Sequence, residues 1–377
     1  MNPNLVKWEK PVFFLLAIGY GFTRSLRFPN DWSEAHWLIT YDMGLLKRAL
    51  VGTLLNPIFS NMDVSQVELT ISLFSFVSVM IFIWLLWKVY QPLPLLVGLA
   101  VVVSPMVVMM LHLNGYFDFQ LVFLGVLALY LIKYEQFILA SVLLAIGILI
   151  HENCIFISMP AAFYAIYSRY DFSSKLTVPV SKVFALPLLV FLSILVFTDR
   201  NSESSLIQEN IITGLGYFPF VASKIEYVAY SFTHSFVSYF KWRRSFLNPV
   251  YFMVFLNCLG MFFLLATGKK KQEKIMLGLI LGFPLILQLI AVDTGRIWIF
   301  PLLIGLQLIL NGGLANLDSS KIKFGAACLL IVNCVYTIPL MDDLVDRVPL
   351  LIRCMVAALA IFGLGFYKKE FWLANEK

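Results

Sequence analysis

The chain alternates between long apolar runs and short polar connections. A transmembrane helix needs about 20 mostly apolar residues, and twelve runs approach that length. We therefore predict an all-α, polytopic integral membrane protein in which residues 1–377 form a single membrane domain. The predicted spans are 10–28, 67–88, 93–111, 117–133, 136–150, 153–168, 182–198, 249–267, 275–292, 296–312, 323–340 and 348–367.

Composition excludes a soluble domain. Hydrophobic residues make up 60% of the 377 residues and charged residues only 13%, whereas a soluble domain carries about 25% charged residues. A single soluble core could not bury this much apolar surface, so the lipid bilayer is the first predicted partner. The five cysteines all lie in apolar runs and are interpreted as small core residues without metal-ligand spacing.

The distribution of Lys and Arg predicts an orientation, because short cytoplasmic loops are enriched in basic residues. With both termini cytoplasmic, the inner loops and tails hold most of the basic residues. The short outer connections hold only Arg296 and Arg347. Arg24 and Arg27, at the outer end of the first span, count against this arrangement. Two long connections, about 29–66 and 199–248, then lie outside.

The first outer loop combines an interfacial helix with charge. Asp31 followed by Glu34 resembles an N-cap with its capping-box partner, and apolar residues continue at helical spacing to about residue 45. Asp42 and the pair Lys47 and Arg48 are predicted to share this element. A carboxylate beside two cations at headgroup depth suits a general base next to an anionic diphosphate. The alternative is an interfacial helix with cations that snorkel to the surface.

Two shorter outer turns also collect polar side chains. One contains His112 and Asp118, with Asp118 at the entrance of a span, where an unpaired carboxylate is costly. The other places His151 and Glu152 directly after an apolar run, so these side chains should face a cavity or each other. Either could act as a base, and both could bind a divalent cation, although their spacing predicts no metal site. Helix capping without chemistry is the alternative for both turns.

The later outer connections add cations. Asp293 and Arg296 lie in a tight turn, where Arg296 suits phosphate recognition or an ion pair with Asp293. Arg353 lies within the last predicted span and should face the bundle interior. The 199–248 loop is aromatic and ends with Arg243 and Arg244, which could bind lipid phosphate or anchor the chain beside the membrane.

This layout resembles periplasm-facing, lipid-dependent bacterial glycosyltransferases. One such group comprises the O-antigen and capsule polymerases, which are polytopic proteins of similar size. The other is the GT-C glycosyltransferases, whose first outer loop carries interfacial helices and an acidic catalytic residue. That resemblance implies that Asp31, Glu34 or Asp42 takes the acidic position. It also implies a bacterial inner-membrane location with the active face toward the periplasm.

The predicted activity is therefore transfer of polyprenyl-diphosphate-linked sugars, with polymerisation of O-antigen, capsule or exopolysaccharide repeats ahead of GT-C-type single-sugar transfer. The expected partners are a polyprenyl-linked donor and acceptor, and other polysaccharide-assembly proteins. No nucleic-acid partner and no cofactor are expected. The alternatives are a transporter or flippase of a lipid-linked or anionic solute and an assembly subunit of an envelope complex. The predicted catalytic residues are Asp42, Glu152 and His151; the predicted substrate-binding residues are Asp31, Lys47, Arg48, His112, Asp118, Arg243, Arg244, Asp293 and Arg296.

Overall fold

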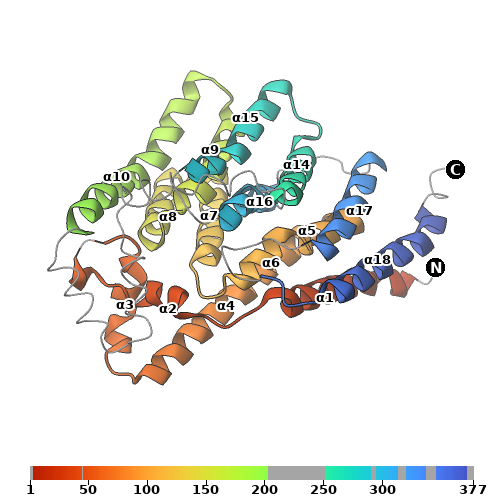
Figure 1. Ribbon diagram of the computed structural model, residues 1–377. Coiled ribbons are helices and arrows are strands. Elements are labelled where there is room, and N and C mark those ends of the chain that lie inside the picture. The colour runs from red at the N-terminus through yellow and green to blue at the C-terminus, as the bar shows by residue number, and fades with distance from the viewer. Residues whose placement is uncertain are drawn as a thin grey trace.

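A computed structural model describes residues 3–44, 46–202, 251–289, 294–312, 320–336 and 345–371. Throughout these ranges the only regular elements are helices, joined by turns and short extended segments (Figure 1). The first half of the chain forms α1 (Pro3–Ser25), α2 (Asp31–Leu38), η1 (Tyr41–Met43), α3 (Ala49–Phe59), α4 (Val64–Tyr90), α5 (Leu95–Val102), α6 (Pro105–His112), α7 (Asp118–Lys133), α8 (Phe137–Ile150) and α9 (Cys154–Tyr170). The second half forms η2 (Ser174–Leu176), α10 (Thr177–Ser202), α14 (Phe252–Ala266), α15 (Lys271–Gly282), η5 (Phe283–Leu289), α16 (Thr294–Leu310), α17 (Ser320–Val335) and α18 (Leu350–Phe371).

The all-helical prediction is confirmed for the described residues, and the described part of each predicted span is mostly helical. Within the described ranges, three segments are long and apolar enough to cross a membrane: Val64–Tyr90, Leu95–His112 and Ser174–Phe197. Several other apolar helices are shorter, including Phe137–Ile150 and Phe252–Ala266. The number of twelve spans and the orientation of the termini stay predictions.

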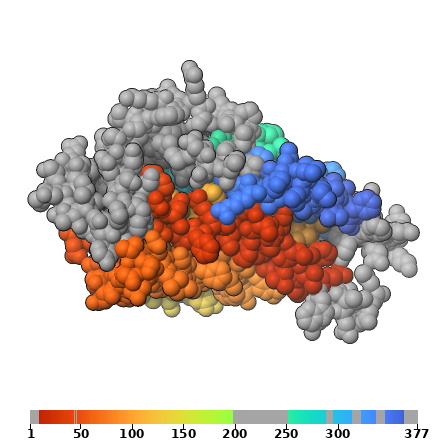
Figure 2. Space-filling model, turned by 60° about the horizontal axis from the view of Figure 1, so that its bottom comes forward, coloured from red at the N-terminus to blue at the C-terminus, as the bar shows by residue number. Residues whose placement is uncertain are grey.

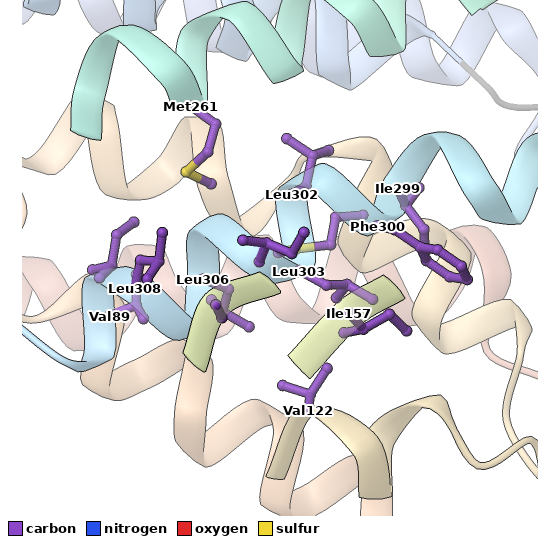
Figure 3. Close-up of a cluster of buried hydrophobic side chains, with 14 of the residues drawn as sticks. Val89, Val122, Ile157, Met261, Ile299, Phe300, Leu302, Leu303, Leu306 and Leu308 are labelled. Carbon is purple, nitrogen blue, oxygen red and sulfur yellow. The ribbon is translucent and has the colours of Figure 1, made fainter. Parts of the chain in front are cut away.

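Helix α16 runs through the centre of the core. It packs against α4, α6, α7, α9, α14 and α15. Figure 3 shows Leu303 and Leu306 of α16 among side chains of the neighbouring helices, with Met261 of α14 on one side and Ile157 of α9 on the other. Burial of this helix on all sides explains why its sequence is apolar without a polar face.

The first outer loop differs from its prediction. The N-cap of α2 is Asn30, whose capping-box partner is Ser33, so the pairing of Asp31 with Glu34 was wrong. The predicted continuous helix was also wrong, because α2 ends at Leu38. Ile39 and Thr40 adopt extended backbone, which β-branched residues favour. Gly44 then has a φ of 120°, which L side chains rarely adopt. Lys47 and Arg48 therefore precede a separate helix, α3.

Large apolar side chains cover the outside of several helices. On α18, Leu351, Leu359 and Phe362 are at least 70% exposed. In the view of Figure 2, α18 lies as a ridge along α1. Contiguous apolar surface of this kind marks a membrane or protein contact. Helix α4, which is long and apolar enough to cross a membrane, also exposes large apolar side chains such as Leu69 and Leu73, which fits contact with lipid.

Candidate functional site

Six polar side chains from distant parts of the chain meet at one end of the helices. We call them the arginine–histidine network: His36, Arg48, Asp118, His151, Glu152 and Arg296. They come from α2, the turn before α3, the start of α7, the turn after α8 and the start of α16. Only Arg48 among them is more than one tenth exposed at its side chain. Buried charges persist in proteins when they are paired, and each charge in this network has a partner.

Arg48 organises the first half of the network. Its Nε lies 2.9 Å from Oε2 and 3.1 Å from Oε1 of Glu152, and Nη2 also donates to Oε1. Its Nη1 lies 2.8 Å from Nε2 of His36, while Nδ1 of His36 lies 2.8 Å from the carbonyl oxygen of Trp32. A carbonyl can only accept, so Nδ1 carries the proton of His36 and Nε2 accepts from Arg48.

Arg296 organises the second half. Its Nη2 lies 2.6 Å from Oδ2 of Asp118, and its Nε lies 3.3 Å from Oδ1. The guanidinium also stands over the ring of Tyr116, 5.2 Å from the centroid, in cation–π geometry. Nη2 of Arg296 is 3.4 Å from Nε2 of His151. The rings of His36 and His151 stack with centroids 6.0 Å apart, which joins the two halves.

Two groups compete for Nδ1 of His151. The backbone N–H of Asn153 donates to it at 3.1 Å, and Oε2 of Glu152 lies 3.2 Å away. When Nδ1 accepts from Asn153, the neutral ring carries its proton on Nε2. Nε2–H of His151 and Nη2–H of Arg296 are then two donors side by side, an arrangement that suits the oxygen of an anion.

The surroundings keep Glu152 ionised and both histidines neutral. Burial opposes ionisation of Glu152, yet Arg48, together with Lys47, holds the pKa of this carboxyl well below its usual range. Burial, reinforced by Arg48 and Arg296, lowers the pKa of His36, and burial and Arg48 lower that of His151. The network therefore carries its charge on arginines and carboxylates rather than on imidazoles.

Among the described residues, cations outnumber anions around this site. Lys47 is buried and lies close enough to favour the charged form of Glu152. With Lys47 included, three cations face the two carboxylates Asp118 and Glu152, while the histidines stay neutral. A buried excess of positive charge attracts an anion more strongly than a solvated one would.

Glycine at two positions allows α2 and α3 to approach this site. A Cβ on Gly52 of α3 would lie 2.1 Å from the carbonyl oxygen of Ile39, so only glycine fits there. Gly115 has a φ of 99°, and its carbonyl accepts a hydrogen bond of 2.7 Å from Nε1 of Trp37 on α2. These contacts place His36 and Arg48 over the ends of α7 and α8.

Other predicted site residues lie outside the network. Asp42 on η1 is exposed and accepts a weak 3.4 Å hydrogen bond from Asn56. Asp31 is exposed at the start of α2. His112 is buried at the end of α6, where its carbonyl accepts from Nε of Arg27 at 2.7 Å. Asp293, Arg243, Arg244 and nearly all of the 199–248 loop fall outside the described residues, so an Asp293–Arg296 ion pair stays a prediction.

Glu34 differs from the paired carboxylates. It is 8% exposed on α2, and burial, with Glu68 and Asp31 nearby, raises its pKa to about 7. A general base at neutral pH works best with a pKa near 7. By this criterion Glu34 is better suited to proton abstraction than the ionised, arginine-bound Glu152.

Sequence reasoning missed two members of the site, His36 and Tyr116. All four histidines, His36, His112, His151 and His234, lie at predicted outer positions in the sequence, and this was a signal for His36. No local pattern distinguishes Tyr116, whose role depends on a guanidinium from α16.

A second buried group joins the ends of the chain. Arg24 of α1 contacts Asp346 at 2.6 Å and donates to the carbonyl of Asn333 at 2.6 Å. Arg353 of α18 contacts the same Asp346 oxygen at 3.1 Å, and it is buried as predicted. Arg24 is buried inside the protein, and its charge is paired with the carboxylate of Asp346.

The described residues contain no group of three or more His, Cys, Asp or Glu side chains that could hold a metal ion. Fold and site define an all-helical protein with helices of membrane-spanning length and a buried, positively biased polar network at the helix ends. Comparisons with protein-family models, curated proteins and solved structures gave no match to this chain.

Proposed function

We propose that this protein is a membrane glycosyltransferase that acts on polyprenyl-diphosphate-linked sugars at the outer face of the bacterial inner membrane. Polymerisation of O-antigen, capsule or exopolysaccharide repeats is the preferred reaction. The observation that carries the proposal is the cluster of three cations among the described residues at the helix ends beneath α2 and α3: the buried Lys47 and Arg296 and the partly buried Arg48.

The network suits the leaving group of such a reaction. When the bond between the sugar and the lipid diphosphate breaks, negative charge develops on the departing diphosphate oxygen. Fixed hydrogen-bond donors around that oxygen stabilise the transition state and lower the barrier to transfer. In the tautomer in which Nδ1 of His151 accepts from Asn153, Arg296 and Nε2–H of His151 offer adjacent donors to one phosphate oxygen. Arg48 and Lys47 supply further charge close by. Asp118 and Glu152 hold the two guanidiniums in place before the substrate arrives.

The acceptor hydroxyl must lose a proton to a base. We assign this step to the α2–η1 segment, where Glu34 has a pKa of about 7 and Asp42 is exposed. Glu152 is better suited to positioning Arg48, because its lowered pKa makes it a weak base.

The charges lie at helix ends, which favours an enzyme over a transporter. Transporters usually place charged groups near the bilayer midplane on broken helices. Asp118 is the first residue of α7, and Arg353 lies in the first turn of α18. Both are buried, but neither lies midway along its helix.

Glycan chain length in a deletion strain tests the proposal. The strain is complemented at matched expression with wild type, Glu152→Gln or Arg296→Ala, and the lengths of its surface polysaccharides are compared. We expect wild type to restore long chains. The variants should leave mainly single-repeat products. Arg296→Ala removes one preorganised donor, which costs roughly 10²-fold in rate, and Glu152→Gln weakens the contact that positions Arg48.

Arg169 and Glu135 provide matched controls. They form an ion pair of 2.5 Å that is exposed and remote from the network. Arg169→Ala and Glu135→Gln should support normal chain lengths. Unchanged glycans in the deletion strain would reject the glycosyltransferase proposal and favour a transport or assembly role.

A further inference from the structure

A cavity of about 420 Å³ lies between α5, α14, α16 and α17, away from the arginine–histidine network. This volume is within the range of small-molecule sites, roughly 300–1,000 Å³. Its walls are mainly aliphatic and include Val97, Met261, Leu264 and Leu329. The cavity can therefore take hydrocarbon but offers little to a polar solute.

The polar residues in the wall do not change this character. Asn257 and Asn333 exchange two hydrogen bonds of 2.9 Å, which use their side-chain amides inside the protein. Thr267 donates to the carbonyl of Phe263 at 2.7 Å. The buried hydroxyl of Ser104 has no partner in the described structure.

The cavity opens onto the surface of the helix bundle. Phe263, in its wall, is 63% exposed, and the neighbouring Phe324 is 68% exposed. Gly325 is an exposed wall residue, and a Cβ added there would meet no atom within 4 Å. Hydrocarbon from a surrounding bilayer would have direct access through this opening.

Lysines flank one end of the cavity. Thr267 lies in the wall directly after α14. Lys269, Lys270 and Lys271 begin two residues further along the chain. Of these lysines, Lys270 and Lys271 are exposed. Lys323 follows the wall residue Ile322 at the start of α17. The other end of α14 lies near the start of α16, where Tyr251 stacks on Trp298. The lysine end is therefore the end of α14 remote from Arg296.

We propose that this cavity binds one acyl chain of an anionic phospholipid, whose headgroup lies at Lys270 and Lys271. The cavity alone selects for hydrocarbon, and the lysines select for negative charge, since each basic residue near a membrane surface attracts anionic lipid. The site lies in the leaflet opposite the arginine–histidine network. It does not depend on glycosyl transfer.

Native mass spectrometry of the full-length, delipidated protein in detergent tests this site. The protein is mixed with equimolar phosphatidylglycerol and phosphatidylcholine of identical acyl chains. We expect roughly tenfold preference for phosphatidylglycerol. Gly325→Leu, which fills the opening, should reduce phosphatidylglycerol binding at least severalfold, and the double variant Lys270→Gln/Lys271→Gln should abolish the headgroup preference.

Matched controls separate the site from general effects. Gly363 on α18 also has no atom within 4 Å of an added Cβ but does not line the cavity, so Gly363→Leu should bind like wild type. Lys133 and Lys175 are exposed lysines remote from the cavity, so Lys133→Gln/Lys175→Gln should keep the preference for phosphatidylglycerol.

Equal binding of the two lipids by the wild-type protein would overturn the proposal, and so would a Gly325→Leu variant that binds phosphatidylglycerol as well as Gly363→Leu does. An effect of the lysine variant alone would assign the preference to surface charge and also reject the cavity site.

Discussion

Arg48 shows how much of this site depends on single side chains. It has a φ of 65°, in the left-handed region, directly before α3. From this position its guanidinium contacts both Glu152 and His36. A buried charge that loses its partner is costly, whereas an exposed ion pair contributes little. The pair Arg48–Glu152 and the exposed pair Arg169–Glu135 therefore allow a direct comparison.

We expect Glu152→Ala to lower the free energy of unfolding by about 3–5 kcal/mol, because it leaves Arg48 without its carboxylate partner. Glu135→Ala should cost no more than about 1 kcal/mol. Thermal or denaturant unfolding of the purified variants measures both. A double variant, Arg48→Met/Glu152→Leu, should recover most of the lost stability and remain inactive. Equal, small effects of the two Glu→Ala changes would show that the buried pair is not a structural requirement.

At the scale of elements, the packing of α3 against α2 brings Arg48 next to His36. Isolated helices as short as these are marginal in water, and they are held by contacts among Trp37, Ile39 and Leu46. The closest approach is at Gly52, which packs against the backbone of Ile39. Separation of the two elements would move Arg48 away from His36.

Gly52→Ala should therefore destabilise the protein by about 1–3 kcal/mol, the usual cost of overpacking, and reduce activity beyond the loss in folded protein. Gly363→Ala, in an exposed helix with open space around it, should be neutral or stabilising by up to about 1 kcal/mol. Melting temperatures and glycan chain length report the two effects. A Gly52→Ala variant with wild-type stability and activity would show that α3 can shift without disturbing the site.

For the whole molecule, the network and the connection after α9 should lie on opposite sides of the membrane. Ser60, after α3, and Ser174, after α9, are both exposed. In a variant with all five cysteines replaced, Ser60→Cys should react with a membrane-impermeant maleimide in spheroplasts. Ser174→Cys should react only after the membrane is permeabilised. Labelling of both positions from the same side would contradict the predicted topology.

The sequence by itself determined the all-helical class and the positions of most helices, because apolar length and polar connections are local properties. The predicted span 93–111 contains two helices, α5 and α6, and Pro105 is the first residue of α6. Proline lacks the N–H that a continuous helix would need at this position. Local pattern also indicated that Arg48, His151, Glu152 and Arg296 are unusual.

Only the tertiary structure decided how these residues pair. Arg48 and Glu152 are 104 positions apart, Arg296 and Asp118 are 178 apart, and Arg24 and Asp346 are 322 apart. Periodicity within one helix carries no information about contacts over such separations. The pairings follow instead from the packing of α16 in the core and of α2 and α3 across the helix ends, which decides which cation meets which carboxylate.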